Sequence, residues 1–526
     1  MSDPYEQDMT EKQAASTPTE SPAKVPYATP DLQRRTAWDL TPFFCILMLC
    51  IVLFPMLARS KPDHCPNDAA RWNTIFYLLE YGTYEYLPDW PKLAWNGGKG
   101  KTADQLTPEQ REKMFHIGEK YYNMPRDIAP FSTSDFVKLP GPNSYYSAKP
   151  PLLPTVLAGV AGVVERVTGR DFGRKAEGEL DPKNLADDPR VIIRTTIILT
   201  QVIPFIICIW LIRSHVVRFS DDVFVRNFTI GVAALATYLT PYLLTLNNHV
   251  FGAMLSLFAI HAAIRIWYDD RREWYWFAIA GFFAAFAAGV ELPAGAFAVL
   301  LFIALVIRAP RETLAYGLPA AIIPVVATFI TNYLGSGRRY WLPMQVYYGV
   351  EGGPYDYAGS YWRNPSGMDA LDEPKLTYFM HLLIGHHGFF LLTPILLLGV
   401  LGAFVHWSRK SPRSQPALAW FVVVLSVAVF IVMGFKTNNY GGGCQGPRQF
   451  FWLIPFWLLM LPAGLEVLAK ARVGRVLCYF FLAVSLFSVY WALPQIGGPD
   501  SVPWTDSWAH ELFRTEYVPG FMRIKY

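Results

Sequence analysis

Long apolar blocks separated by short polar segments fill most of the chain. Eleven blocks approach or reach the length of about 20 residues that lets a helix cross a bilayer, and they are 41–58, 191–212, 227–246, 250–268, 274–290, 292–307, 314–334, 385–406, 415–435, 450–468 and 476–493. Apart from Arg194, Arg265 and Glu466 near their ends, these blocks contain essentially no charged residues. The pattern predicts an all-α polytopic membrane protein with about eleven transmembrane helices.

A twelfth apolar block, 151–167, is shorter, has prolines at its start and ends in Glu165 and Arg166. It could span the bilayer or lie along its surface. Short cytoplasmic loops of membrane proteins carry an excess of Lys and Arg. If block 151–167 does not cross the bilayer, most Lys and Arg of the short loops fall on the cytoplasmic side, whereas a crossing would mostly invert this bias. We therefore expect a helix lying at the outer interface.

This assignment divides the chain into three parts. Residues 1–40 are rich in Pro, Ser, Thr, Glu and Gln without an apolar period, which predicts a disordered cytoplasmic tail. Residues 41–493 form the membrane domain, whose first outer loop, 59–190, is large and contains the interfacial helix. Residues 494–526 form an outer C-terminal tail, and 335–384 and 436–449 are also outside. Loops of this size usually carry function.

Composition narrows the class of protein. Of the 526 residues 52% are apolar and 17% are charged, against roughly 25% charged in an ordinary soluble domain, which excludes a simple soluble enzyme. A net charge of +4 from 46 Lys and Arg and 42 Asp and Glu is small and dispersed, so no nucleic-acid partner is expected. The six cysteines have no CxxC spacing, and they do not predict a zinc site.

Polar and ionisable residues gather at the predicted outer ends of the spans. Ion-coupled transporters need ionisable groups inside the membrane and often matched repeats, and the sequence has neither. Cations beside a bilayer interface suit a lipid that carries phosphate, because Arg binds phosphate oxygens bidentately and Lys binds them as a point charge. Such cations, together with a carboxylate that can deprotonate an acceptor, are the residue types that a transferase with a lipid-phosphate donor requires.

Three segments carry a resemblance to a known family. They are Asn67-Asp68-Ala69-Ala70-Arg71-Trp72, Leu79-Glu80-Tyr81-Gly82-Thr83-Tyr84 and Tyr146-Ser147-Ala148-Lys149-Pro150-Pro151-Leu152-Leu153. Together they resemble the GT-C superfamily of polyprenyl-phosphate-sugar-dependent glycosyltransferases, in particular the branch of protein O-mannosyltransferases and aminoarabinose lipid A transferases. In that branch an acidic residue follows the first span and a KPP segment opens an interfacial helix.

The resemblance implies a fold and a function. It implies a GT-C-like membrane domain that transfers a sugar from a polyprenyl-phosphate donor to a lipid, glycan or protein acceptor. The protein would lie in the cell (inner) membrane with its active site on the periplasmic or extracytoplasmic face. A polytopic transporter or lipid flippase without transferase chemistry is the alternative.

Two carboxylates are candidates for the catalytic base, because a base must lie within hydrogen-bond reach of the reacting proton. Asn67 stands where the family has the Asp of an Asp-Glu pair, and Asp68 follows it, which leaves the base open between Asp68 and Asp135. Asp68 after Pro66 could instead cap a helix, and Asp135 could be an ordinary turn residue.

Four cations are candidates for binding the donor phosphate. Lys149 precedes two prolines that hold it extended, although a lysine there could merely snorkel to the interface. Arg190 and Arg194 are one helical turn apart and could clamp the phosphate or anchor the helix end. Arg448 follows a Gly-rich loop, 438–447, whose backbone N–H groups can approach a ligand closely.

The remaining site candidates are substrate-binding residues in outer loops and short outer turns, namely Asn67, Arg71, His249, Glu291 and His387. His386 and His387 do not predict a metal site, because adjacent residues on a helix point about 100° apart. No metal or cofactor is required for this chemistry, and a divalent cation is compatible with it but not indicated. Cys65 and Cys444 are the two cysteines placed outside, where a disulfide between them is a hypothesis.

Overall fold

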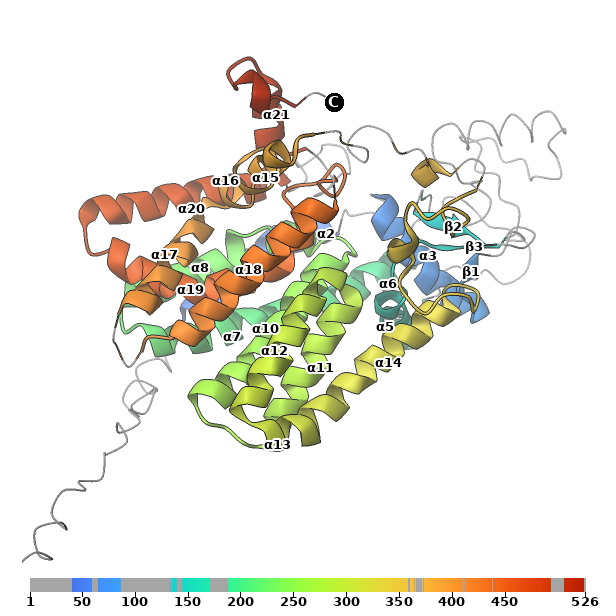
Figure 1. Cartoon of the computed structure of the whole chain (residues 1–526), viewed down its shortest axis with the longest axis horizontal. Helices are drawn as coiled ribbons and strands as arrows, with labels where there is room; N and C mark the ends of the chain where they lie inside the picture. The colour runs from blue at the N-terminus through green and yellow to red at the C-terminus, as the bar shows by residue number, and fades with distance from the viewer. Residues whose placement is uncertain are drawn as a thin grey trace, which may run out of the picture.

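The structure is a computed structural model that describes residues 40–58, 65–86, 133, 135–139, 144–170, 188–357, 360–363, 365, 371, 373–409, 411, 413–437, 439–492 and 506–524. The predicted cytoplasmic tail therefore lies outside the described residues, apart from Leu40. Much of the first outer loop also lies outside them. The described part is mostly helical (Figure 1).

The long helices follow the predicted apolar blocks, except for the helix Lys375–Ile384, which lies in the segment 335–384 that was predicted to be an outer loop. Their bounds are α2 Thr41–Leu57, α6 Asp188–Ile197, α7 Ile203–Phe219, α8 Val223–Leu235, α10 Asn248–Tyr268, α11 Trp274–Val290, α12 Gly295–Arg308, α14 Leu318–Leu334, α15 Lys375–Ile384, α17 Leu397–Ser408, α18 Pro416–Lys436, α19 Ile454–Leu468 and α20 Arg472–Ala492. Six continuous helical segments in the described residues are long and apolar enough to cross a membrane, and a seventh does so if one bent pair is a single span. Four apolar helices are shorter, so the predicted count of about eleven spans stays a prediction.

Two predicted spans are broken. Block 227–246 forms only α8 and the four-residue α9, Leu239–Tyr242. The Thr240 hydroxyl donates to the Ala234 carbonyl oxygen at 3.0 Å, which occupies a carbonyl that a continuing helix would have used. Block 385–406 contains α16 (Phe389–Leu392) and α17, and the helix pair 375–392 and 394–408 bends by 88°. Both breaks leave irregular backbone near polar side chains.

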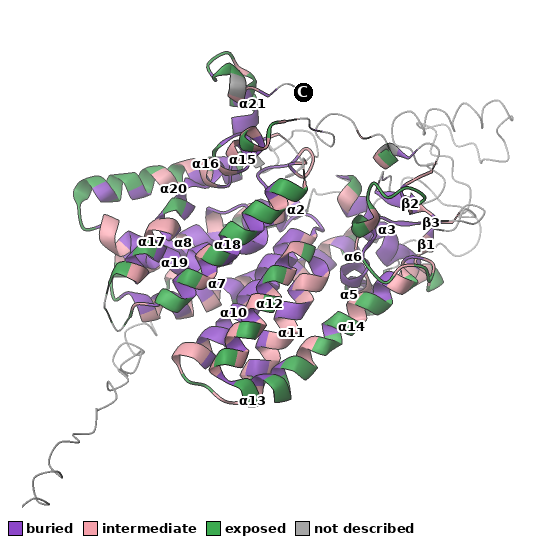
Figure 2. Ribbon diagram, in the orientation of Figure 1, coloured by how far each residue is buried: buried purple, intermediate pink, exposed green. Residues whose placement is uncertain are grey.

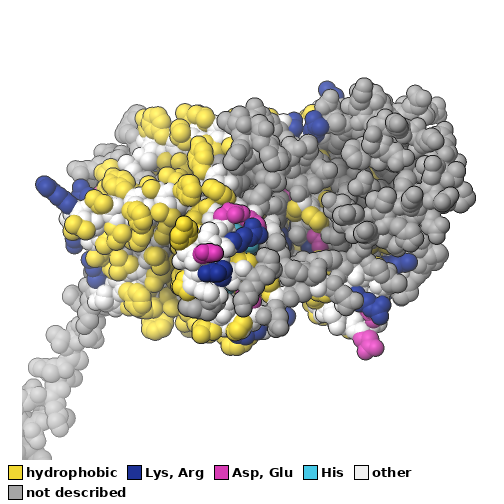
Figure 3. Space-filling view, turned by 90° about the horizontal axis from the view of Figure 1, so that it is seen from above, with side chains coloured by type: hydrophobic (Ala, Val, Ile, Leu, Met, Phe, Trp, Pro, Cys, Tyr) yellow, Lys and Arg dark blue, Asp and Glu magenta, His cyan; other side chains and the backbone are white. Residues whose placement is uncertain are grey.

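The bundle has a centre and a periphery (Figure 2). In α10, and in α19 together with the 3-10 turn before it, 83% of the apolar window is buried. The corresponding share is 17% in the segment that contains α14 and 28% in α20. The outer helices therefore present apolar side chains outward, and hydrophobic side chains cover a broad part of the face in Figure 3. An apolar surface of this extent is typical of a membrane or partner interface.

A small three-stranded sheet departs from the all-α prediction. Its order is β1-β3-β2, with β1 Glu85–Tyr86, β2 Phe136–Lys138 and β3 Tyr145–Ser147, and both pairings are antiparallel. The central strand β3 begins with two tyrosines, a residue type enriched in strands. The sheet lies beside α3, Pro66–Tyr81 (Figure 1).

The predicted interfacial helix is α5, Leu152–Thr168, which ends at Gly169 in the left-handed conformation with a φ of 64°. It packs against α3 and α6. In Figure 1 it is seen nearly end-on, whereas α10, α11 and α12 run across the picture. The helix therefore crosses the direction of the bundle steeply.

Charged side chains separate into two ends of the bundle. At what we call the turn end, short turns are joined by ion pairs: Arg218 with Asp269, Arg308 with Asp270, and Arg413 with Asp221. At what we call the site end lie the sheet, the start of α3, residues 244–249 and residues 439–448. Helix α14 runs from α13 (Pro310–Glu312) at the turn end toward the sheet (Figure 1).

Candidate functional site

Helix α3 carries the first part of the site. It begins after Cys65, with Pro66 at its first position, and Asp68 stands in its first turn. The N-cap is therefore Cys65 and not Asp68, so capping does not account for this carboxylate. Asp68 and Arg71 are 2% and 3% exposed. A carboxylate in the first helical turn is favoured by the helix dipole, which offsets part of the cost of burying Asp68.

Asp135 and Lys149 form the second part. Lys149 Nζ lies 3.0 Å from Asp135 Oδ1, and both side chains are largely buried. Thr133 holds Asp135 beside α3: its hydroxyl donates to the Pro66 carbonyl oxygen at 2.6 Å and accepts from the Asp135 N–H at 3.0 Å. The strand pairing of the sheet continues through Ala148, whose N–H donates to the Asp135 carbonyl oxygen. The ion pair is thus fixed against the start of α3.

Arg71 joins α3 to the turn before α10. Its guanidinium donates to the carbonyl oxygens of Asn67 at 2.9 Å and Leu246 at 3.4 Å, and to the Asn248 side chain. Asn247 caps α10 by accepting from the Val250 N–H at 3.0 Å, which orients that turn. Several Arg71 donors are therefore used within the protein, where they hold the turn before α10 beside α3.

Asn248 extends this network to Glu291. Its amide donates to Glu291 Oε2 at 2.6 Å, and His249 Nδ1 lies 2.7 Å from the same oxygen. Gly252 on α10 permits the approach, because a Cβ there would lie 3.1 Å from Glu291 Cβ. Glu291 and His249 are therefore in contact, as a shared site requires.

The Gly-rich loop brings Arg448 to the same end. Gly441 has a φ of 104°, and a Cβ on it would lie 2.9 Å from Arg448 Nε. The Arg448 side chain thus packs directly on the glycine. Asn439 Oδ1 accepts from the N–H groups of Gly441 and Gly442, so these two N–H groups are used within the loop, contrary to the expectation that they face a ligand.

The charges of these segments act on one another. Burial lowers the pKa of Lys149, the charges of Arg71 and Arg448 lower it further, and Asp135 raises it. Burial likewise lowers the pKa of Arg71, while Asp68 opposes this shift. We call Asp68, Arg71, Asp135, Lys149 and Arg448 the ionic cluster. It holds three cations and two carboxylates, and Asn248 connects Arg71 to a third buried carboxylate, Glu291. Cations in a low-dielectric site interact strongly with an anionic ligand.

The structure thus brings together most of the predicted site residues, namely Asn67, Asp68, Arg71, Asp135, Lys149, His249, Glu291 and Arg448. Arg190 and Arg194 lie on α6 and are half-buried. His387 lies in a different group, stacked on Tyr440 with ring centroids 5.0 Å apart.

The predicted disulfide between Cys65 and Cys444 is not present. Both are buried free thiols. Cys444 Sγ donates instead within its own loop, toward the carbonyl oxygens of Gly441 and Gly446. Burial, with the nearby Asp68 charge, raises the pKa of Cys65 well above its ordinary value, so this thiol is unreactive in its site.

The sequence-based site list omitted Asn248 and His510. Asn248 bridges Arg71 and Glu291. The sequence feature that could have indicated it is the Asn-Asn-His run, 247–249, in a short turn. His510 stands on α21, Trp508–Arg514, and is fully buried. It lies in the segment taken as a tail, where the Ser507 side chain caps the helix by accepting from the His510 N–H.

Comparisons with known proteins give a structural likeness only. No protein-family model matches the chain, and no curated protein matches it in sequence. Solved structures of the Archaeoglobus fulgidus oligosaccharyltransferase are similar to it. The apo form has a TM-score of 0.43 and 12% identity, over 94% of this chain and 60% of that chain. The complex with Zn and sulfate has a TM-score of 0.39 and 11% identity, over 92% and 57%.

A third structure, of the oligosaccharyltransferase AglB from the same organism with an inhibitory peptide and a dolichol-phosphate, has a TM-score of 0.36 and 11% identity, over 93% and 60%. This chain therefore spans about three fifths of the length of the protein that it matches. At these scores the roles of individual residues have to be argued from the chain itself.

Proposed function

We propose that the chain is a membrane glycosyltransferase of the GT-C type that transfers a hexosyl or pentosyl group from a polyprenyl-phosphate donor to a lipid, glycan or protein acceptor. The observation that carries the proposal is the ionic cluster, in which Arg71, Lys149 and Arg448 gather beside carboxylates at a buried site. Preorganised cations in such a site stabilise the charge that develops on a departing phosphate. No cofactor needs to be invoked for that role.

In the proposed reaction, the acceptor hydroxyl or amine attacks the anomeric carbon in line, its proton passes to a carboxylate, and the bond between that carbon and the phosphate oxygen breaks. Lys149 and Arg448 stabilise the lipid phosphate that leaves. Asp135 is engaged by Lys149 at 3.0 Å, so we assign the base to Asp68 and the positioning of Lys149 to Asp135. Attack in line inverts the configuration at the anomeric carbon.

The placement in the membrane follows from the same proposal. The turn end carries the short basic loops that the charge rule puts inside, and the site end then faces the periplasmic or extracytoplasmic side. Helix α5 crosses the bundle direction, which suits a helix at the outer interface. A lipid donor would reach the ionic cluster from that interface, and Arg190 and Arg194 on the neighbouring α6 could guide its phosphate.

The test is transfer of radiolabelled sugar from polyprenyl-phosphate donors by the purified protein. We expect label to move to an acceptor or to water, and Asp68→Asn to abolish this transfer while donor binding persists. Arg413→Ala at the turn end is the control and should transfer normally. If no donor is consumed and none binds, the lipid-phosphate proposal fails. Transport or lipid flipping then becomes the hypothesis to test.

A further inference from the structure

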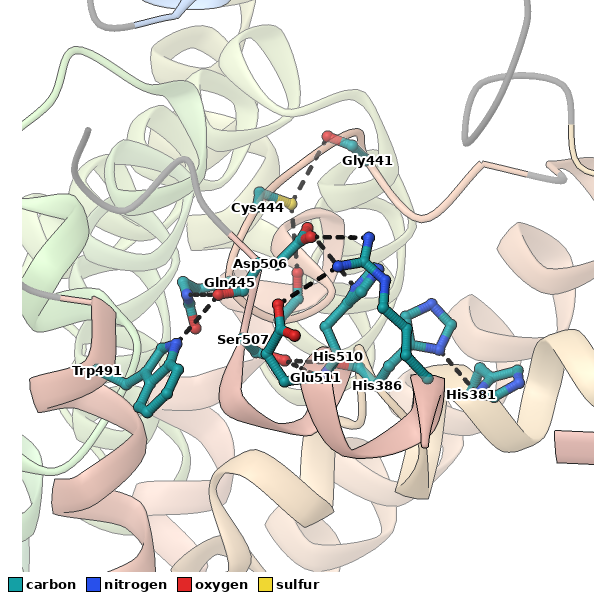
Figure 4. Close-up of polar contacts among 12 residues, drawn as sticks. His381, His386, Gly441, Cys444, Gln445, Trp491, Asp506, Ser507, His510 and Glu511 are labelled. Atoms are coloured by element: carbon teal, nitrogen blue, oxygen red, sulfur yellow. Dashed lines mark hydrogen bonds and ion pairs between the residues drawn. The ribbon is translucent and has the colours of Figure 1, made fainter. Parts of the chain in front are cut away.

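Three buried histidines meet at a place that the proposed reaction does not use. His386, His387 and His510 each offer one ring nitrogen, and these nitrogens all lie within 4.8 Å of one another. In the part of the chain that the structure describes, this is the one group of three potential metal ligands so close together. All three side chains are at most 1% exposed. Figure 4 shows that His386 and His510 come from different segments.

The local backbone makes this arrangement possible. His386 and His387 do not lie on a helix, as the sequence prediction assumed, but in the break between α15 and α16. Their ring centroids are 4.7 Å apart with planes at 83°. Gly385 opens the break, since a Cβ on it would lie 2.6 Å from the Cα of His381. Both neighbouring imidazoles can therefore reach one point.

A neighbouring histidine orients one of the rings. His386 Nδ1 lies 2.8 Å from His381 Nδ1, and histidine ligands of metals are typically oriented through their second nitrogen in this way. Neither ring nitrogen of His387 has a hydrogen-bond partner among the described residues, which is costly for a buried polar group. Asp506 Oδ1 lies 3.7 Å from His510 Nδ1, beyond hydrogen-bond distance.

We propose that His386, His387 and His510 bind a divalent transition metal, best matched by zinc. Three neutral imidazoles with a fourth position for water are a common zinc ligand set. Zinc–nitrogen distances of about 2.0–2.1 Å require the three nitrogens to draw together from their present spacing.

The site would fasten the C-terminal segment to the break between α15 and α16. Ser507 Oγ donates to the His386 carbonyl oxygen at 2.8 Å, and Gln445 Nε2 of the Gly-rich loop donates to the Asp506 carbonyl oxygen at 2.7 Å (Figure 4). A metal bound by the three histidines adds a link between α21 and the break. This link does not depend on the proposed transferase activity.

The test is metal binding by the full chain in detergent after removal of metal with a chelator. We expect one equivalent of zinc to bind and to raise the melting temperature, with affinity weaker by on the order of 100-fold or more in His387→Asn and His510→Asn. His261→Asn, a buried histidine elsewhere, is the matched control and should bind like the unsubstituted chain. Equal zinc binding in all four proteins, or none in the unsubstituted chain, would overturn the site.

Cobalt(II) provides a second measurement that requires no variant. Bound to three imidazoles and water, it should show the visible absorption of tetrahedral cobalt, and zinc should abolish that absorption. A sulfur-to-cobalt charge-transfer band would contradict the proposal, because it would place the metal on cysteine thiolates. This measurement decides the question even if the histidine variants fail to fold.

Discussion

The two ends of the bundle use the same residue types in different ways. At the turn end Arg218 binds Asp269 through two hydrogen bonds of 2.9 and 2.7 Å, and Arg413 meets Asp221 at 2.6 Å with about half of each side chain exposed. At the site end Lys149 meets Asp135 with side chains 14% and 5% exposed. Water screens the charges of Arg413 and Asp221, whereas it screens poorly those of Arg218 and Asp269, which are 11% and 13% exposed, and those of Lys149 and Asp135.

The two ends are therefore best compared through Arg413–Asp221 and Lys149–Asp135, because the buried Arg218–Asp269 pair shows that burial alone does not mark the site end. Exposed ion pairs contribute roughly 0–1 kcal/mol each, so the turn end can lose the Arg413–Asp221 pair with little effect. Buried charges cost several kcal/mol unless they are paired. The predictions below try to break the contrast between these two pairs.

The largest effect is expected from Lys149→Ala. It leaves Asp135 buried without its cation, which should lower the free energy of unfolding by about 3–5 kcal/mol and abolish sugar transfer. The double variant Lys149→Ala with Asp135→Ala should recover much of the stability but none of the transfer. Denaturation in detergent and the transfer assay measure the two effects. Recovery of transfer in the double variant would show that the pair serves stability alone.

Gly441→Ala should come next. Its φ of 104° disfavours any side chain, and the added Cβ would displace Arg448. We expect KM for the donor to rise by about tenfold, because a tenfold change corresponds to the loss of roughly one hydrogen bond to a charged group. Gly442→Ala is the matched control, because Gly442 also has a positive φ, 79°, but no atom lies within 4 Å of its added Cβ. Equal KM values in the two variants would remove Arg448 from donor binding.

The pH dependence sharpens the role of Asp135. Lys149 must be charged to hold phosphate, and burial lowers its pKa, so transfer should decline with rising pH earlier than an ordinary lysine predicts. In the same window stability should rise with pH, because the folded state binds the proton less tightly than the unfolded state. Asp135→Asn removes the charge that raises this pKa, so the decline should move to lower pH. If transfer by the Asp135→Asn variant declines at the same high pH as transfer by the unsubstituted chain, Lys149 does not control that decline.

Much of the fold could be predicted from the sequence, because a helix that crosses a bilayer must be apolar over a fixed length. The breaks after Leu235 and around Gly385 could not, since each depends on contacts formed only in the folded chain, such as the bond from Thr240 to the Ala234 carbonyl. The small sheet could not be predicted from the sequence for a related reason. Its strands are two or three residues long, too short for an alternating pattern to be visible.

Some residues of the candidate site could be predicted because local sequence features mark them. Asp68 follows the first apolar block, Lys149 precedes two prolines and Arg448 follows a Gly-rich loop, so the sequence itself marks them. Their partnership was not predictable, because Asp135 reaches Lys149 only through the sheet and Thr133. His510 was missed because periodicity gives no sign that a short helix far along the chain packs against His386.

The smallest effect is expected from Arg413→Ala at the turn end. Its partner Asp221 is about half exposed, so water replaces the lost cation and the free energy of unfolding should change by less than about 1 kcal/mol. Sugar transfer should be unchanged, and the small loss of stability should vanish at high salt, where exposed charges are screened. A loss comparable to that of Lys149→Ala would mean that both ends hold their charges in the same way, and the contrast between them would fail.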